Sequence, residues 1–272
     1  MKTPGSLPGT VIAIFVLALL LTAALIAPWL APYDGSAITG DLWQPMSAQH
    51  WLGTDNLGRD LFSRLLYGTR LTLLFAFAIA LLAMIAGTLI SFLAVSLGGR
   101  KEQVISRIND LFMSLPSLIL SLVALAVLPQ ENLTLIVVLA AIEATRVYRL
   151  GYALAKQISA MEYMEATLLA GESHRWRIFH EMLPNAWVPL LTEFGVRFGY
   201  CVLFVSTLSF LGLGVQPPTA DWGSIVRENR DGILFGVSAA FYPAIAIALL
   251  VISTNMVVDA LSRYWQRQAG GQ

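Results

Sequence analysis

Few side chains in this sequence are of the types that catalyse reactions, and their spacing does not favour catalysis. The three histidines are His50, His174 and His180, and the single cysteine is Cys201. His180 and Glu181 begin like a zinc-protease motif, but no second histidine follows four residues after His180. The sequence also has no Gly-Lys pair, which a phosphate-binding P-loop requires. We therefore expect no enzyme activity, no ATP site, no metal site and no cofactor.

Charged side chains within apolar stretches are stronger functional candidates, because a charge in hydrocarbon costs several kcal/mol unless it is paired or hydrated. Glu143, Glu193 and Arg197 are of this kind. Glu193 and Arg197 are four residues apart, so a helix places them on one side, which favours an internal ion pair. Glu143 could pair with Arg146, or it could line a solute path and meet a cationic group. The sequence alone is compatible with both interpretations of Glu143.

The composition is that of a membrane protein. Hydrophobic residues make up 57% of the 272 residues, charged residues make up 12%, and the mean hydropathy is +0.69. A soluble domain has about half apolar and about a quarter charged residues, and here the apolar residues gather in long blocks. The net charge is zero, which gives no electrostatic reason to expect nucleic acid as a partner. We expect an all-α polytopic membrane protein surrounded by lipid.

Six transmembrane helices are expected, the third with a kink at Pro116. Their approximate ranges are 11–29, 71–97, 108–128, 133 to beyond Arg146, 186–213 and 241–261. The first resembles a retained anchor rather than a signal peptide, because it is too long and lacks a cleavage site. This predicts an anchor at 1–31, an outer segment at 32–70 with a short amphipathic helix at 57–66, and a five-helix core at 71–265.

The distribution of lysine and arginine predicts the orientation. If the N-terminus is inside, the inner segments contain Lys2, Arg100, Lys101, Arg107, Arg146, Arg149, Lys156, Arg175, Arg177, Arg263 and Arg267. The outer segments then contain only Arg59, Arg64, Arg70, Arg227 and Arg230. We therefore expect both termini and the polar loop 156–185 in the cytoplasm.

The loop 156–185 has the composition of a docking element. Residues 162–170 are good helix formers, Gly171 can adopt the positive φ that ends a helix, and residues 172–182 can form a second helix closed by Pro184. Its apolar side chains are too many for free solvation: Leu168, Leu169, Trp176, Ile178 and Phe179. Some must face the membrane domain and some could face a partner. A plain connector lying on the bilayer is the alternative.

The spacing within this loop resembles a known motif. Glu165-Ala166-Thr167, three residues, Gly171, nine residues and then Glu181-Met182-Leu183-Pro184 resembles the EAA loop of ABC importer permeases, Glu-Ala-Ala, three residues, Gly, nine residues, Ile-x-Leu-Pro. Thr167 replaces the third alanine and Glu181 stands in the isoleucine position. Glu181 suggests that this position faces water or a basic partner.

Two further stretches narrow the resemblance. Residues 50–64 (HWLGTDNLGRDLFSR) and 208–223 (LSFLGLGVQPPTADWG) look like segments of dipeptide, oligopeptide and nickel permeases. The resemblance covers nearly the whole chain and points to the second, C-type, permease subunit.

The resemblance implies a type I ABC importer permease fold in the bacterial inner membrane. The subunit would pair with a sister permease, two ABC ATPase subunits on the cytoplasmic side and a periplasmic substrate-binding protein. The expected function is half of an ATP-driven translocation path for peptides or peptide-like solutes. A nickel or metal-chelate permease is the alternative, and a self-sufficient secondary transporter is the weaker one.

Site residues follow from these patterns. ATPase coupling is expected from Glu165, Ala166, Gly171, Ser173, Trp176, Phe179, Leu183 and Pro184. Glu165 could cap its helix or pair with Arg175 or Arg177. Contacts with periplasmic partners are expected from Asp55, Arg59, Asp60 and Trp222. Local turn and cap chemistry is the equal alternative for the first three, and a bilayer-interface anchor is the alternative for Trp222.

Overall fold

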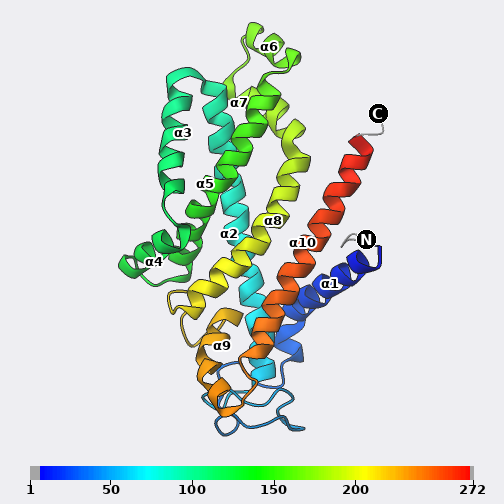
Figure 1. The fold of residues 1–272 in the computed structure, drawn as a ribbon, viewed down its shortest axis with the longest axis vertical. Coiled ribbons are helices and arrows are strands. Elements are labelled where there is room, and N and C mark those ends of the chain that lie inside the picture. The colour runs from blue at the N-terminus through cyan, green and yellow to red at the C-terminus, as the bar shows by residue number, and fades with distance from the viewer. Residues whose placement is uncertain (1–6, 270–272) are drawn as a thin grey trace. The chain divides into compact units, whose positions relative to one another are not determined.

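The fold of the chain is helical, as the composition predicts. The computed structural model describes residues 7–269, so the predicted inner position of Lys2 lies outside the described residues. Between residues 7 and 269 there is no β-strand, only two isolated bridges that join Ile38 to Arg59 and Thr54 to Asp60. The chain is therefore an all-α protein in the part that the structure describes (Figure 1).

Within residues 7–269, four helical runs are long and apolar enough to cross a membrane. They are α1 (Leu7–Leu30), α2 (Leu61–Leu97), the continuous run His174–Phe210 and α10 (Phe241–Ala269). A fifth crossing results if α3 (Gly99–Ser114) and α4 (Ser117–Val127) form one broken span. The remaining predicted span, fourth along the chain, corresponds to α5 (Asn132–Ser159). Every 18-residue stretch of α5 contains three charged residues, Glu143, Arg146 and Arg149. The count of six therefore stays a prediction.

The helices divide into two compact units. Of the described residues, unit 1 comprises 7–77, 128–135 and 198–269, and unit 2 comprises Ala78–Val127 and Ile136–Arg197. In unit 1, α1 packs on α10, and α9 (Trp222–Asn229) also lies against α10. The short 3-10 helix η2 (Arg230–Phe235) continues α9. Much of α1 is exposed and apolar, with Leu25 73% and Phe15 66% exposed, which suits a helix that faces lipid.

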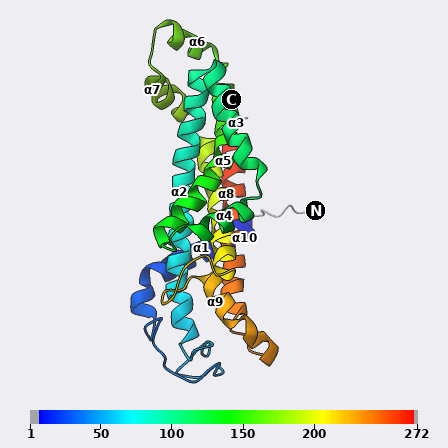
Figure 2. The same ribbon diagram turned by 90° about the vertical axis from the view of Figure 1, so that its left-hand side faces the viewer.

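Unit 2 contains the second part of α2, helices α3, α4 and α5, and the first part of α8 (Leu183–Phe210). The loop between α5 and α8 forms α6 (Glu162–Leu169), α7 (His174–Trp176) and the π-helix η1 (Arg177–Met182). Figure 2 shows α6 and α7 together at one end of this unit. The loop therefore has its own compact structure.

Two predictions about this region are wrong. There is no separate amphipathic helix at 57–66, and the second span does not start at residue 71. Leu57 and Gly58 lie in a turn, Arg59 and Asp60 form the two isolated bridges, and α2 starts at Leu61 and runs for 37 residues. The Asp60 carboxylate starts it, because its Oδ2 accepts hydrogen bonds from Ser63 N at 2.8 Å and Ser63 Oγ at 2.7 Å. At about 1.5 Å per residue, α2 is longer than the roughly 30 Å of hydrocarbon.

The prediction that the third span is one helix with a kink at Pro116 is also wrong. The chain turns at Gly98 and Gly99, whose φ values are 64° and 56°, so α2 ends where the glycines predict and α3 starts at once. Pro116 then separates α3 from α4, and the two helices meet at 87°. Leu115 is extended, with φ −87° and ψ 135°, because proline disfavours the helical conformation of the residue before it.

Pro184 does not end a helix, contrary to the prediction. The helix that starts after Ser173 continues through Pro184 to Phe210, so the fifth span starts earlier than residue 186. Proline cannot donate a backbone hydrogen bond. The π-helix η1 lies immediately before Pro184, and its wider turn shifts the hydrogen-bond pattern by one residue, so the helix passes the missing donor.

The backbones of α2 and α5 approach each other closely at Gly87. A Cβ atom on Gly87 would lie 2.6 Å from the Ala144 carbonyl oxygen and 2.6 Å from Val147 Cβ. Both views show α2 and α5 side by side (Figures 1 and 2). The glycine therefore permits this packing.

Gly87→Ala should destabilise the protein by about 1–3 kcal/mol, because both neighbours are rigid. Gly199→Ala is the matched control, since its Cβ would lie 3.7 Å from the nearest atom, and a helical alanine should be neutral or stabilising. Thermal unfolding in detergent, followed by circular dichroism, measures both. Equal melting temperatures for the two variants would contradict the packing argument.

Candidate functional site

The loop between α5 and α8 is organised around Gly171. This residue follows α6 and has φ +77°, a value that side chains rarely adopt. No atom lies within 4 Å of a Cβ built there, so the requirement for glycine comes from the backbone and not from crowding. Ser173 then starts α7, and its Oγ accepts a hydrogen bond from Trp176 N at 3.2 Å. The two short helices thus have defined ends.

One face of the loop is packed into unit 2. Met164 of α6 and Met182 of η1 are each 1% exposed, and Ile178 is 5% exposed. They join a core cluster with Phe92 and Val95 of α2. A displacement of the loop must therefore move residues that belong to the core of the membrane unit.

A buried arginine ties the loop to the end of α2. Arg177 Nη2 donates to the Ser96 carbonyl oxygen at 3.3 Å and to His174 Nδ1 at 2.8 Å, and Ser96 Oγ lies 2.9 Å from the same Nδ1. Because arginine only donates, His174 Nδ1 must accept. Arg177 is therefore engaged with α2 and not with Glu165, which is exposed and for which residues 7–269 show no ion pair.

The other face of the loop is exposed and apolar. Leu169 is 84% exposed, Leu168 is 55% exposed and Phe179 is 52% exposed. Trp176 is half-buried and stacks on His180, with ring centroids 5.2 Å apart. Of the other predicted coupling residues, Glu165, Ala166, Gly171, Ser173 and Pro184 are exposed, and Leu183 is half-buried.

The three predicted intramembrane charges belong to one network. Glu143 is 1% exposed, and it accepts from Arg146 Nη1 at 2.5 Å and from Arg197 Nη1 at 3.2 Å. Arg197 Nε also pairs with Glu193. Two carboxylates and two guanidinium groups make the network neutral, which is the condition for keeping charges at this depth.

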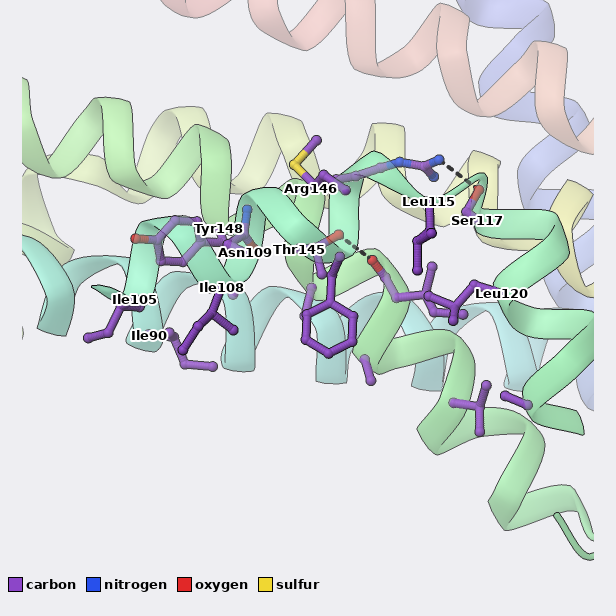
Figure 3. Close-up of a pocket in the computed structure, with 18 residues that line it drawn as sticks. Ile90, Ile105, Ile108, Asn109, Leu115, Ser117, Leu120, Thr145, Arg146 and Tyr148 are labelled. Carbon is purple, nitrogen blue, oxygen red and sulfur yellow. Dashed lines mark hydrogen bonds between the residues drawn. The ribbon is translucent and has the colours of Figure 1, made fainter. Parts of the chain in front are cut away.

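An apolar cavity of about 440 Å³ borders this network (Figure 3). Its walls come from α2, α3, α4 and α5 and include Ile90, Ile108 and Leu120. Figure 3 shows Arg146 extending toward Ser117, to which its Nη2 donates at 2.9 Å. The volume is in the range of small-molecule sites, about 300–1,000 Å³. The cavity thus combines apolar walls with one polar side, formed by Arg146, Ser117 and Thr145.

A second charge network holds the outer segment to α9. Asp55 Oδ2 accepts from Arg59 Nε at 2.6 Å and from Arg64 Nη1 at 2.5 Å. Glu228 Oε2 of α9 accepts from Arg59 Nη2 at 2.5 Å and from Arg64 Nη1 at 2.9 Å. Sequence patterns missed Glu228, because 164 residues separate it from Arg64 (228 − 64) and no local spacing records that pairing.

The four side chains predicted to contact periplasmic partners are buried within this chain. Asp55 and Trp222 are fully buried, Asp60 is 1% exposed and Arg59 is 7% exposed. The Oδ1 atom of Asp60 also lies within hydrogen-bond distance of His50 Nδ1, at 2.9 Å. The structure favours the turn-and-cap interpretation for the acidic residues and Arg59.

Trp222 is not an interfacial anchor. Its Nε1 donates to the Leu65 carbonyl oxygen at 3.1 Å, and its backbone N donates to Thr72 Oγ1 at 3.1 Å. The preceding residue, Asp221, caps α9 by accepting from Gly223 N at 3.3 Å and Ser224 N at 3.1 Å. Burial raises the pKa of the Asp221 carboxyl. Trp222 and Asp221 therefore fasten α9 to α2 within unit 1.

Asp221→Asn should leave the melting temperature almost unchanged, because asparagine keeps the capping oxygen and removes a buried charge. Asp221→Ala should destabilise the protein by about 1–2 kcal/mol through loss of the cap. Thermal unfolding in detergent distinguishes them. A larger loss for asparagine than for alanine would show that the charge itself is required.

Glu143→Gln should destabilise the protein by about 3 kcal/mol, because both arginines lose their shared carboxylate. Adding Arg146→Gln should recover part of that loss, because Arg197 keeps Glu193 and Arg146 is the guanidinium group left without a carboxylate. Arg146→Gln is the control, since 38% of the Arg146 side chain is exposed and its loss should matter less. Thermal melting measures all three, and equal losses for the two single variants would argue against the network.

Comparison with known proteins agrees with this geometry. A family model described as "Binding-protein-dependent transport system inner membrane component" matches residues 81–269. The nickel transport system permease protein of Escherichia coli K12 is 38% identical, over 92% of this chain and 91% of its own. The probable D,D-dipeptide permease protein of the same strain is 34% identical, over 97% and 89%.

A third relative is the di/tripeptide transport system permease protein of Pseudomonas aeruginosa, 34% identical over 93% of this chain and 86% of its own. The match thus extends over nearly the whole sequence. The chain belongs to the family of binding-protein-dependent transport system inner membrane components and is a membrane permease of such a system.

Proposed function

We propose that this permease forms half of the translocation path of an ATP-driven importer for peptides or peptide-like solutes. The observation that carries the proposal is the two-faced loop between α5 and α8. Met164 and Met182 are buried in the core of unit 2, whereas Leu168 and Leu169 are exposed. A partner that binds the exposed face and shifts the loop can therefore move the membrane helices, because the buried face packs against them.

The partner that binds the loop is an ABC ATPase subunit. The complex contains two such ATPases, together with this chain and a sister permease. The family works with a binding protein, which delivers solute from the outside. The exposed apolar side chains of α6 and η1 suit insertion into a groove on the ATPase. Glu165 and Ala166 lie on the same exposed helix and take part in that contact.

Six spans in a type I importer fold, with both termini cytoplasmic, complete the proposal. The anchor is 1–31, the periplasmic segment is 32–60, and the permease core runs from Leu61, where α2 begins, to residue 265. Charges near the loop support its cytoplasmic position: Lys156 pairs with Glu102 at 2.6 Å, and Arg100 and Lys101 lie in the first turn of α3. The neutral network explains how α5 crosses the membrane despite Glu143 and Arg146.

Peptides are favoured as the solute because the relatives include permeases named for D,D-dipeptides, di/tripeptides and glutathione. Nickel or a metal chelate is the second candidate, since the relative named for nickel transport is 38% identical. In either case Glu143, Glu193 and Arg197 are the candidate path residues, and their network reaches the apolar cavity through Arg146.

The proposal is tested by reconstitution. The permease, its sister subunit and the ATPases are purified in mild detergent and placed in vesicles with the binding protein. ATP-dependent accumulation of labelled dipeptides supports the importer assignment. Failure of the ATPases to copurify, or uptake that continues without ATP, would favour a self-sufficient transporter instead.

Gly171→Pro should lower ATP-dependent uptake by about tenfold or more, because proline fixes φ near −65° and reorients α6 relative to α7. The permease should still insert, since Gly171 is exposed and a side chain there would meet no core residue. Gly171→Asn is the control, because asparagine tolerates a positive φ. Uptake by the proline variant at the level of the control would reject the coupling role.

A further inference from the structure

We propose that the apolar cavity of unit 2 holds one acyl chain of an anionic phospholipid, whose phosphate is bound by Arg100 and Lys101 of α3. This site goes beyond the proposed function, because its ligand is a lipid of the membrane and not the transported solute. The choice of ligand follows from the walls of the cavity, from the order of side chains along α3 and from charge.

The cavity opens on the surface of unit 2, and its walls are mostly apolar. Ile108 and Phe112 line it and are about half exposed, at 53% and 50%. Arg146, the one charged residue among the described residues that line it, already pairs with Glu143 and donates to Ser117. Polar groups of a ligand that found no partner here would be costly to desolvate, whereas a hydrocarbon chain needs no partner.

The other polar side chains of the lining offer little to a polar ligand. Tyr148 hydrogen-bonds to Ser106 at 2.7 Å, and the Thr145 hydroxyl donates to the Ile142 carbonyl oxygen at 2.7 Å. Asn109 is 9% exposed, so it presents little surface to the cavity. The lining therefore suits an acyl chain.

Lys101 lies in line with the residues of α3 that line the cavity. Ile105, Ile108 and Phe112 follow it after four, seven and eleven residues, which is the spacing of one helix face. Figure 3 shows Ile105 and Ile108 close together at one end of the cavity. The stripe thus begins with a charge and continues with apolar side chains, the order of phosphate and acyl chain in a phospholipid.

The spacing along this stripe also fits a phospholipid. Ile105 is one turn beyond Lys101, about 6 Å along the helix axis. The headgroup layer of one leaflet is about 5–8 Å thick, half the difference between the roughly 40–45 Å bilayer and its roughly 30 Å hydrocarbon core. A phosphate at Lys101 therefore brings the acyl chain to the first apolar residue of the cavity.

The charges at the start of α3 favour an anionic headgroup. Arg100 and Lys101 are exposed, and neither forms an ion pair in the part of the chain that the structure describes. Glu102 is buried and pairs with Lys156 at 2.6 Å. Asp110 is exposed but follows Lys101 by nine residues (110 − 101), which places it on the opposite side of the helix. A phosphate beside Lys101 thus meets two cations and no competing acid of α3.

Photo-crosslinking of the complete transporter in mild detergent tests the site. The probe is phosphatidylglycerol with a photoactivatable diazirine in one acyl chain, and mass spectrometry identifies the labelled peptides. Labels should concentrate on the cavity-lining segments 105–124 and 138–148. Unlabelled phosphatidylglycerol should compete about 20-fold better than phosphatidylcholine, the effect of two cations near a headgroup.

Lys101→Gln should lower this preference for phosphatidylglycerol about fivefold, because one of the two cations is lost. Arg107→Gln is the matched control. Arg107 is an exposed basic residue of the same helix, but it follows Lys101 by six residues and so lies off the stripe. Its substitution should leave the preference unchanged.

Ala141→Trp tests the cavity itself. Ala141 lines the cavity and is exposed, so a larger side chain there fills the cavity without displacing the core. Labelling of the lining segments should fall about tenfold, as a competing side chain of several kilocalories' burial excludes the acyl chain. Val137→Trp is the matched control, because Val137 is exposed on the same helix and does not line the cavity.

Equal labelling of α1 and of the cavity segments would show surrounding bilayer lipid only and would overturn the site. Equal competition by the two lipids, or a preference that survives Lys101→Gln, would also overturn it. Labelling that persists in Ala141→Trp would reject the cavity as the place of the acyl chain, and cross-links from the lining to the sister permease would assign the cavity to that subunit. ATP-dependent uptake is measured separately, because its failure rejects the proposed function and leaves the lipid labels unchanged.

Discussion

Charges placed away from water must find their partners within the chain, and this constraint shapes both units. Glu143 in unit 2 neutralises Arg146 and Arg197, and Glu193 balances the remaining guanidinium group. A second network of two acids and two arginines joins the outer segment to α9: Asp55, Arg59, Arg64 and Glu228. Each network is neutral, so each can be buried without an isolated charge.

The loop between α5 and α8 is the second feature of unit 2 that joins distant parts of the sequence. The loop between α5 and α8 has a buried face that contains Met164 and Met182 and an exposed face that contains Leu169. Its rigidity comes from Gly171, from the Ser173 cap and from the Arg177 link to Ser96. A stiff element with one face in the core can pass on a displacement, whereas a flexible connector would absorb it.

Sequence patterns predicted the membrane class, most of the helices and the location of the loop, because apolar periodicity and glycine signals are local. They failed where tertiary contacts compete with local signals. Pro184 looked like a helix end, but the π-helix η1 carries the helix past it. Residues 57–66 looked like a separate surface helix, but the Asp60 cap starts one long helix at Leu61.

The sequence by itself determined the family, through the spacing from Glu165 to Pro184 and the segments 50–64 and 208–223, because motif spacing is written along the chain. Only the tertiary structure decided what many of those residues do. It shows that Asp55 and Trp222 are buried and that Glu228 pairs with Arg59 and Arg64. Partners more than 150 residues apart are set by packing, which no local pattern encodes.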